Sequence, residues 1–301
     1  MSVLNTPALQ DFLKKHLNHA SGPRVAVFDC DGTMIKGDIG EAMLYHQIEH
    51  FHFRRSPANV WEDHPERGTL DALFQHLARL SAEERRKDSA FEQFAKAVLS
   101  WYFGQIADGK VEKACTDIVR LFTGYTLPEV REIAEATFRS ESTAPLAERT
   151  LGGYTRPRGI RYIAETLDVF RALQHSGFSL WVVSGSNQWS VESVFRRLAL
   201  PLDHVIGIDL EVHNGLLTAA AVEPVPIHKK KIEALRARET AEPLLIASDS
   251  RLDLPLLQYS ADIKLFINSR RKTSAEFFEL TGVARDDRWV VVEHPTLLDH
   301  V

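Results

Sequence analysis

The sequence predicts an α/β protein: a doubly wound parallel sheet with a mainly helical domain inserted after its first core strand. Three observations predict this fold class. A short apolar run at 25–28 (VAVF) is typical of a buried strand and leads directly into Asp29. Between Met34 and about Arg158 the apolar residues have helical spacing, and no convincing strand is found. From near Gly152-Gly153 onward strands and helices alternate, as they do in parallel sheets.

The first strand would have no neighbours unless the later strands pair with it across the insertion. We therefore expect one domain to comprise residues 1–35 and 159–301, and the helical insertion to comprise residues 36–158. The two domains would meet above the carboxyl ends of the strands, where open α/β sheets bind ligands.

The apolar spacing predicts the individual elements in chain order. A first helix begins at Pro7, with Leu9, Phe12 and Leu13 on its apolar face. Further helices are expected at 39–50, 70–80, 91–103, 111–122, 127–138, 164–175, 190–198, 229–237 and 254–259. Strands are expected at 178–183, 205–210, 216–221, 244–247, 263–267 and 290–292, with Asn214-Gly215 as a hairpin turn.

The composition narrows the class of protein. A hydrophobic fraction of 44% and a charged fraction of 26% are ordinary for a globular protein, and the net charge of −5 favours neither nucleic acid nor an anionic membrane surface. The sequence contains no apolar run of membrane-spanning or signal-peptide length. The chain has two cysteines, Cys30 and Cys115, and so few cysteines favour a reducing compartment. A single disulfide between them is the alternative. We expect a cytoplasmic monomer or homodimer.

Asp29 and Asp31 follow the first strand directly and are the first candidate site. Two carboxylates at the end of an apolar strand are costly to hold together unless a cation lies between them. A hard, oxygen-seeking ion such as Mg²⁺ suits them best. Gly32 allows a tight turn after them. A solvated β-turn is the alternative interpretation.

Two further stretches could bind an anion. Ser184 follows the strand at 178–183, and its hydroxyl could bind an anion together with the main-chain N–H groups of Gly185 and Ser186. The alternative interpretation is that Ser184-Gly185 is an ordinary loop after the strand. The run Lys229-Lys230-Lys231 opens a helix, and one of these ammonium groups turned inward could neutralise a phosphate. Which of the three faces inward is left open.

Asp249 and Asp253 follow the strand at 244–247. They could complete an oxygen-ligand metal site with Asp29, or they could be a helix cap and a surface carboxylate.

These four stretches, in this order, resemble the haloacid dehalogenase superfamily over most of residues 24–268. The pattern is strand–Asp-x-Asp-Gly-Thr, strand–Ser-Gly, a lysine, and strand–Asp-Ser-x-x-x-Asp. The helical insertion resembles the cap of the phosphoserine phosphatase-like branch, so the resemblance implies a Rossmann-like catalytic core and a cap that sets specificity. One departure is Ala247-Ser248-Asp249, which stands where the family usually has Gly-Asp.

The resemblance also implies roles. Asp29 would be the nucleophile that forms an aspartyl-phosphate, and Asp31 would protonate the leaving oxygen and then activate water. Thr33 and Ser184 would hold phosphoryl oxygens, while Lys231 would offset charge on Asp29 and on the phosphoryl group.

The resemblance also implies a metal site whose ligands are mainly carboxylates. Asp29, Asp249 and the main-chain carbonyl of Asp31 would hold Mg²⁺, with Asp253 close behind.

The start of the cap bears on the substrate. The stretch Gly37-Asp38-Ile39-Gly40-Glu41-Ala42 is similar to that of phosphorylcholine phosphatases, and it implies that Asp38, and Glu41 one turn later, contact a substrate amine. The alternative interpretation of Glu41 is a carboxylate that caps the helix or lies in solvent. Aromatic faces suit a quaternary ammonium, and the candidates are Trp61, Trp101, Tyr102, Phe103 and Trp189.

We therefore expect a Mg²⁺-dependent phosphomonoesterase for a small, amine-bearing phosphorylated metabolite such as phosphocholine, phosphoethanolamine or phosphoserine. A phosphotransferase of the same superfamily and a non-catalytic phosphate- or metal-binding module are the alternatives.

Overall fold

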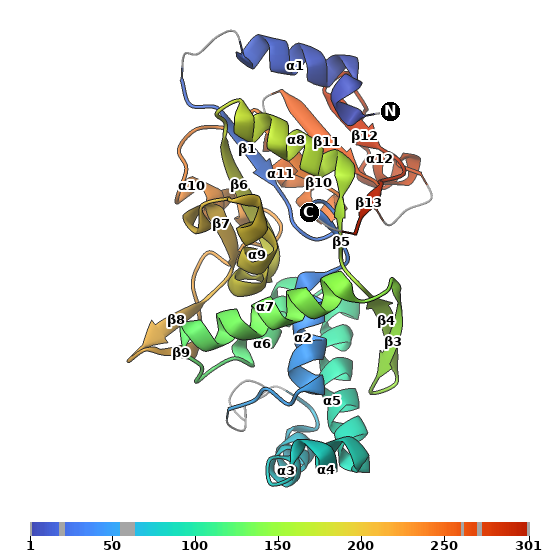
Figure 1. Ribbon diagram of the computed structural model, residues 1–301, viewed down its shortest axis with the longest axis vertical. Helices are drawn as coiled ribbons and strands as arrows, with labels where there is room; N and C mark the ends of the chain where they lie inside the picture. Colours follow the sequence, from blue (N-terminus) through green and yellow to red (C-terminus); the bar gives the residue numbers. More distant parts are fainter. Residues whose placement is uncertain (1, 18–21, 55–63, 260–261, 270–272, 300–301) are drawn as a thin grey trace.

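A six-stranded parallel sheet forms the centre of the computed structural model, which describes residues 2–17, 22–54, 64–259, 262–269 and 273–299 (Figure 1). The strand order is β12-β11-β10-β1-β6-β7. Every pair along this order is parallel, and β1 lies between β10 and β6. The strands are β1 (Val25–Phe28), β6 (Ser179–Asn187), β7 (Val205–Ile208), β10 (Leu245–Ser248), β11 (Ile263–Ile267) and β12 (Trp289–Val292).

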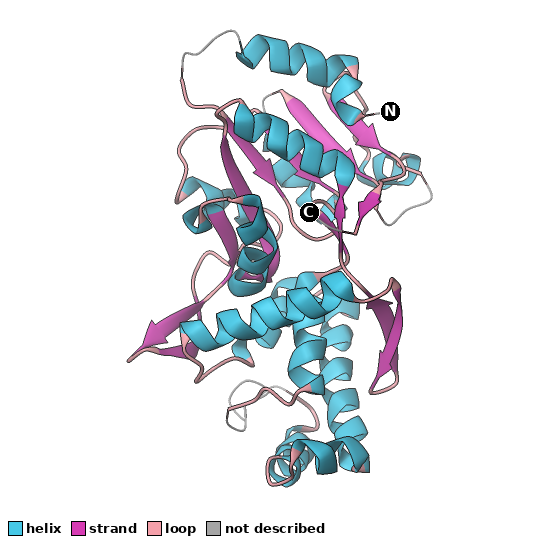
Figure 2. Cartoon of the chain, in the orientation of Figure 1, coloured by secondary structure: helices cyan, strands magenta, loops and turns pink. Residues whose placement is uncertain are grey.

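Helices cover both faces of this sheet, so the predicted doubly wound α/β class is confirmed (Figure 2). One face packs against α1 (Pro7–Leu17), α8 (Ala164–His175) and α9 (Gln188–Phe195). The other packs against α10 (Lys230–Arg236), α11 (Leu254–Tyr259) and α12 (Ala275–Thr281). Alternate residues of β1 point to opposite faces, which is why a four-residue strand can anchor both layers.

The inserted segment is mainly helical, as predicted. Its helices are α2 (Ile39–Glu49), α3 (Arg67–Leu77), α4 (Ala82–Lys87), α5 (Ser89–Ala107), α6 (Val111–Arg120) and α7 (Leu127–Thr143). Of these, α4 was not predicted, because none of its residues is buried and its sequence carries no apolar stripe. The helices α2, α3, α5 and α6 share a hydrophobic cluster separate from those of the sheet, with Leu44, Leu70, Phe94 and Val98 among its buried members.

The expectation of no strand between Met34 and Arg158 was wrong. Strands β3 (Ala147–Leu151) and β4 (Tyr154–Arg158) form an antiparallel hairpin whose turn is Gly152-Gly153, with both glycines at positive φ. Most of their residues are exposed or half-buried and several are charged, so the hairpin has no apolar run to indicate it. A short β2 (Ile35–Lys36) also pairs with β5 (Arg161–Ile163).

Two other details differ from the expectation or extend it. The strand expected to end at Val183 continues as β6 to Asn187, so Ser184 and Gly185 lie within its last residues rather than in a loop. The Asn214-Gly215 hairpin is confirmed and joins β8 (Leu210–His213) to β9 (Leu216–Ala221).

The disulfide that the sequence left open is not formed, because Cys30 and Cys115 are both free thiols.

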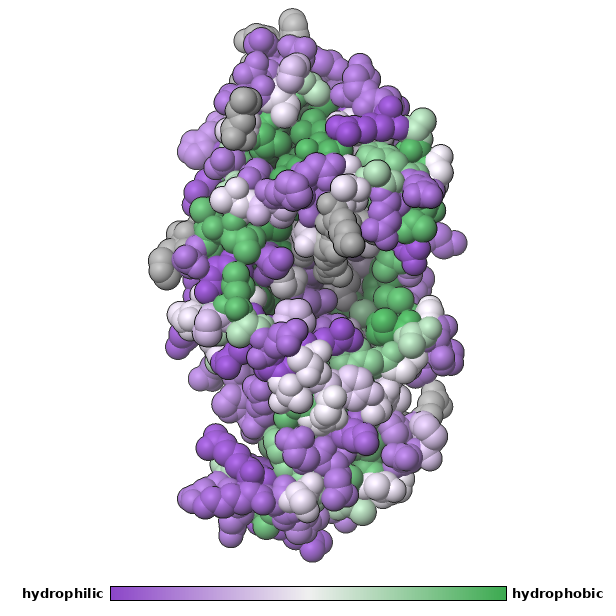
Figure 3. Space-filling model, turned by 90° about the vertical axis from the view of Figure 1, so that its right-hand side faces the viewer, coloured by the Kyte–Doolittle hydropathy of each residue, from purple (hydrophilic) through white to green (hydrophobic). Residues whose placement is uncertain are grey.

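None of the helices in the described residues combines the length and the apolar character needed to cross a membrane. Hydrophilic side chains cover most of the face shown in Figure 3, with separate hydrophobic patches between them.

Packing of α9 against β7 gives a prediction on stability. A Cβ added at Gly207, on β7, would lie 2.7 Å from main-chain atoms of Gln188. We expect Gly207→Ala to lower the free energy of unfolding by about 1–3 kcal/mol, because backbone must move to admit the methyl group. Urea denaturation measures this. Gly104 in α5 is the matched control: an added Cβ meets nothing within 4 Å, so Gly104→Ala should raise stability by about 0.5–1 kcal/mol. A Gly207→Ala protein as stable as wild type would contradict the packing.

Candidate active site

The candidate site lies at the carboxyl edge of the sheet, beside the point where the strand order reverses. From β1 the chain proceeds to β6 and β7 on one side, and later to β10, β11 and β12 on the other. Ligands of open α/β sheets bind at such a switch point. A cavity of about 150 Å³ lies there, and the predicted residues that line it are Asp29, Asp31, Asp38, Glu41, Gly185, Lys231, Asp249 and Asp253.

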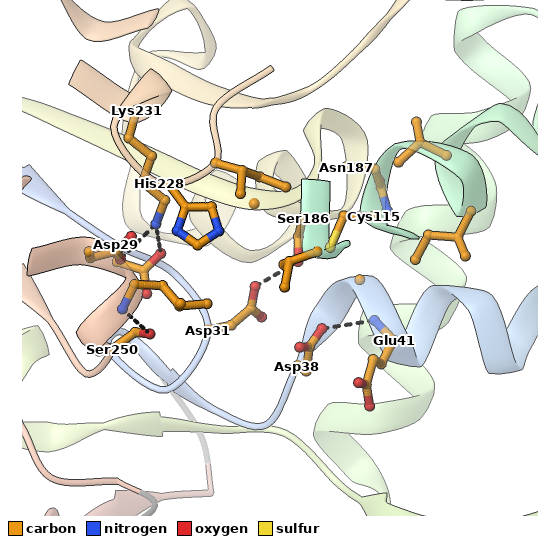
Figure 4. Close-up of a pocket in the computed structure, with 18 of the residues that line it drawn as sticks. Asp29, Asp31, Asp38, Glu41, Cys115, Ser186, Asn187, His228, Lys231 and Ser250 are labelled. Carbon is orange, nitrogen blue, oxygen red and sulfur yellow. Dashed lines mark hydrogen bonds and ion pairs between the residues drawn. The ribbon is translucent and has the colours of Figure 1, made fainter. Parts of the chain in front are cut away.

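A buried lysine joins two of the predicted aspartates. The ammonium of Lys231 donates to Asp29 Oδ1 at 2.8 Å (Figure 4). It also donates to Asp253 Oδ2 at 2.7 Å, and all three side chains are buried. The hydroxyl of Ser248 donates to the same Asp253 oxygen at 2.8 Å. Asp253 is thereby committed to holding Lys231 in place.

Burial and charge act against each other in this group. Burial raises the pKa of Asp29 to about 7; Lys231 opposes this rise, while Asp253 and Asp249 add to it. Burial alone would lower the pKa of Lys231, but the Asp253 and Asp29 carboxylates outweigh it and hold that pKa above its ordinary value. One buried cation therefore serves more than one carboxylate.

Only one lysine of the run 229–231 faces the cavity. Lys230 pairs with Glu112 at 2.7 Å and with Glu223 at 3.6 Å, and Lys229 is exposed. The sequence did not decide which of the three lysines turns inward, and in the structure it is Lys231.

Asp31 is held on the facing wall of the cavity. Its Oδ2 accepts from the Ser186 hydroxyl at 2.6 Å, and its Oδ1 accepts from the main-chain N–H of Ile39 at 2.7 Å. Burial, followed by the negative charges of Asp38 and Asp29, raises the pKa of Asp31 well above its ordinary value. A carboxyl group whose pKa is raised beside a nucleophile is suited to act as a general acid.

Thr33 and Ser184, predicted to hold phosphoryl oxygens, lie behind the cavity wall and do not line it. The Thr33 hydroxyl donates to Asp29 Oδ2 at 3.1 Å. The Ser184 hydroxyl accepts from the N–H of Ser186 at 3.1 Å and lies 3.4 Å from Asp31 Oδ2. Both side chains therefore orient residues that do line the cavity.

The carboxylates of Asp29 and Asp249 could serve as the few protein ligands of a metal ion. Within the described parts of the chain, no three His, Cys, Asp or Glu side chains converge as ligands. Asp29 and Asp249 line one cavity, and a Cβ added at Gly32 would lie 2.1 Å from Asp249 Oδ2, so this carboxylate lies against the loop after β1. Mg²⁺ is typically bound by one or two carboxylates, several waters and a substrate phosphate, which matches this set.

The far end of the cavity belongs to the inserted helices. Asp38 caps α2, accepting from the Glu41 N–H at 2.8 Å, and both acidic residues line the cavity together with Tyr102. Apolar groups of α6 complete this end; they are Val111, Ile118 and Val119, beside the half-buried Cys115.

Of the other aromatic candidates, none of the described ones lines this cavity. Trp189 is fully buried, and Phe103 stacks on Tyr154. Trp101 lines a separate cavity within the helical domain. Trp61 lies outside the described residues.

Sequence reasoning missed Ser186, Asn187 and His228 as side chains that line the cavity. Ser186 and Asn187 were missed because β6 was expected to end four residues early, although the polar run after Val183 was visible. His228 lies at φ 53, a conformation that non-glycine residues seldom adopt, and no local pattern in the sequence indicates it.

Comparisons with known proteins agree with this architecture. The model of the haloacid dehalogenase-like hydrolase family matches residues 104–258, just over half of the chain, which includes Ser184, Lys231 and Asp249. No curated protein matches the chain.

Two solved structures share the fold. A conserved, functionally unknown protein from Anaerococcus prevotii DSM 20548 is 15% identical, with a TM-score of 0.72 over 94% of this chain and 91% of the other. A protein of unknown function from Bordetella pertussis Tohama I is 16% identical, with a TM-score of 0.57 over 91% of this chain and 99% of the other. At these identities the similarity shows the fold alone.

A structure described as a phospho-aspartyl intermediate analogue of phosphoserine phosphatase is also similar. It is 15% identical, with a TM-score of 0.43 over 82% of this chain and 87% of the other. That TM-score is too low to support an argument on activity or substrate.

Removal of the shared ammonium gives the second prediction. We expect Lys231→Met to lower the free energy of unfolding by about 3–5 kcal/mol in metal-free buffer, because it leaves Asp29 and Asp253 buried without a cation. Thermal or urea denaturation measures the loss. Lys230→Met is the matched control and should change stability by less than about 1 kcal/mol, since its ion pairs are solvent-screened. Equal small losses in both variants would show that Lys231 is not the buried counter-ion.

Proposed function

The chain belongs to the haloacid dehalogenase-like hydrolases, and we propose that it is a Mg²⁺-dependent phosphomonoesterase acting through an aspartyl-phosphate on Asp29. The observation that carries the proposal is the arrangement of two carboxyl groups in one cavity. Asp29 is held by the Lys231 ammonium, and Asp31 is held on the opposite wall with a raised pKa. One is suited to attack and the other to donate a proton.

In the proposed first step an Asp29 oxygen attacks the phosphorus of the monoester, and the bond to the leaving oxygen breaks. Asp31 donates its proton to that oxygen, so the alcohol leaves neutral. The resulting Asp31 carboxylate then accepts a proton from water as the water oxygen attacks phosphorus. The bond between phosphorus and the Asp29 oxygen breaks, inorganic phosphate leaves, and the Asp29 carboxylate is restored. Ser186 and the Ile39 N–H keep Asp31 aimed at the cavity in both steps.

Charge stabilisation comes from the cavity walls. Lys231 lies against Asp29 and offsets the negative charge that gathers on the phosphoryl oxygens. Asp29, Asp249 and the main-chain carbonyl of Asp31 would hold Mg²⁺, and the bound ion supplies further positive charge against those oxygens. Thr33, Ser184 and Asp253 support these groups from behind.

We assign catalysis and specificity to different parts of the chain. Residues 1–35 and 159–301 form the catalytic core, and residues 36–158 form the cap that closes the far end of the cavity. Free Cys30 and Cys115 agree with a cytoplasmic location.

The proposed substrate carries an amine beside its phosphate. At the cap end, Asp38 and Glu41 offer negative charge and Tyr102 offers an aromatic face, which together suit a cationic group.

The third prediction tests the activity. The purified chain should hydrolyse p-nitrophenyl phosphate with Mg²⁺ and lose this activity in excess chelator. Asp29→Asn should lower turnover by several orders of magnitude, because it removes the nucleophile at constant shape. Its circular dichroism spectrum should match wild type. A metal-dependent turnover that survives Asp29→Asn would reject the covalent mechanism, and a folded wild type without turnover on any phosphomonoester would favour a binding module.

The fourth prediction tests the substrate. Asp38→Asn keeps a side chain that caps α2 but removes the charge. We expect it to raise KM for phosphocholine by about tenfold or more, because a charge partner is lost, and to leave KM for p-nitrophenyl phosphate nearly unchanged. Steady-state kinetics on both substrates give the comparison. Equal losses on both would make Asp38 structural, and a wild-type preference for sugar phosphates would reject the amine-bearing substrate.

A further inference from the structure

The cavity at the end of β1 is strongly acidic for a site that binds a phosphate monoester. The carboxyl groups that line it among the described residues are those of Asp29, Asp31, Asp38, Glu41, Asp249 and Asp253. The same lining holds one lysine, Lys231, and no arginine. Two N–H groups of the Lys231 ammonium already donate to aspartates, which leaves one for a ligand. Because like charges repel, an anionic phosphoryl group needs further hydrogen-bond donors here.

The hydroxyl groups nearest to Asp29 and Asp31 do not supply those donors. Thr33 and Ser184 lie behind the cavity wall, and the Thr33 hydroxyl donates to Asp29. Ser186 does line the cavity, but its hydroxyl donates to Asp31 at 2.6 Å. A donor for the phosphoryl oxygens must therefore come from another part of the lining.

His228 lines this cavity and belongs to the turn that leads into α10. Its main-chain oxygen accepts from the Lys231 N–H at 3.2 Å, so one turn carries both the imidazole and the ammonium that holds Asp29. Figure 4 shows the ring on the Lys231 side of the cavity, away from Glu41. The imidazole therefore enters the cavity at its Asp29 end.

Two observations indicate that the His228 side chain serves a ligand. The half-buried ring forms no hydrogen bond, ion pair or ring contact with any of the described residues. Its main chain has a φ of 53°, in the left-handed region that residues other than glycine seldom adopt. Such a conformation costs free energy, and it is found mainly where a side chain must be aimed at a functional site.

We propose that the His228 imidazole binds a phosphoryl oxygen of the substrate beside Lys231. The inference rests on the phosphatase function proposed above and adds a residue to its binding site. An imidazole carries an N–H donor in either tautomer, so the ring donates to one non-bridging oxygen while the remaining N–H of Lys231 donates to another. Because both donors come from one turn, the main chain that places the lysine also places the imidazole.

The test is the binding of inorganic phosphate to the full chain in buffer with Mg²⁺, measured by titration calorimetry. His228→Gly removes the imidazole and leaves a residue that adopts a φ of 53° without strain, so its thermal denaturation should match wild type. We expect this variant to bind phosphate about tenfold more weakly, since a hydrogen bond to a charged group is lost.

Asn214→Gly is the matched control for the change of backbone. Asn214 has a φ of 50°, is exposed in the β8–β9 turn and does not line the cavity. This variant should bind phosphate like wild type.

A measurement on the wild type does not depend on how the variants fold. The ring nitrogens of His228 give NMR signals that are assigned by their loss in His228→Gln, and these signals should shift saturably as phosphate is added at constant Mg²⁺. The inference is overturned if the signals do not move while phosphate saturates the protein, if His228→Gly binds phosphate as tightly as wild type, or if wild type binds no phosphate.

Steady-state kinetics separate this inference from the proposed function. His228→Gly should raise KM for phosphocholine and for p-nitrophenyl phosphate by a similar factor, because the phosphoryl group is common to both. A loss confined to one substrate would place His228 at the leaving group and overturn the inference. Wild-type turnover with unchanged phosphate binding in His228→Gly would overturn the inference alone. A His228 signal that responds to phosphate in a protein that hydrolyses no phosphomonoester would reject the phosphatase alone.

Discussion

The buried ammonium of Lys231 is the interaction on which the candidate site depends. It joins Asp29 at the end of β1 to Asp253 in the turn after β10, and it comes from α10 on one face of the sheet. Two carboxylates in such a place would take up protons if no cation were present. Because Lys231 is also committed to Asp253, it holds Asp29 without fully neutralising the site, which leaves the acidic character that a divalent cation needs.

The inserted domain is built into this site at its first helix. The N–H of Ile39, at the start of α2, donates to Asp31, and Gly40 lies so close to β6 that an added Cβ would be 2.6 Å from the Ser186 hydroxyl. That hydroxyl donates to the other Asp31 oxygen. One carboxyl group therefore connects the sheet to the inserted helices, and the first residues of α2 line both the candidate-site cavity and a second cavity between α2 and the β3–β4 hairpin.

The return of the chain from the cap to the sheet is fixed by Arg161. Its buried guanidinium donates to the main-chain oxygens of Ala144, Ser142 and Ile160 and forms an ion pair with Asp299. Arg161 belongs to β5, which pairs with β2 and with β13 (Leu297–Leu298) in a small antiparallel sheet. The chain therefore leaves the sheet for the inserted helices through β2 and returns through β5, and these two strands pair with each other.

The sequence by itself determined the features that depend on neighbouring residues. Apolar periodicity indicated the sheet strands and most helices, and the position of Asp29 and Asp249 after two apolar strands placed them at one edge of a parallel sheet. Tertiary structure alone decided which lysine turns inward, since three adjacent lysines are equivalent until Asp29 and Asp253 are close in space. It also decided that Ser186 lines the cavity while Ser184 and Thr33 lie behind it, since β6 continues to Asn187 and its last residues, from Gly185 on, reach the cavity.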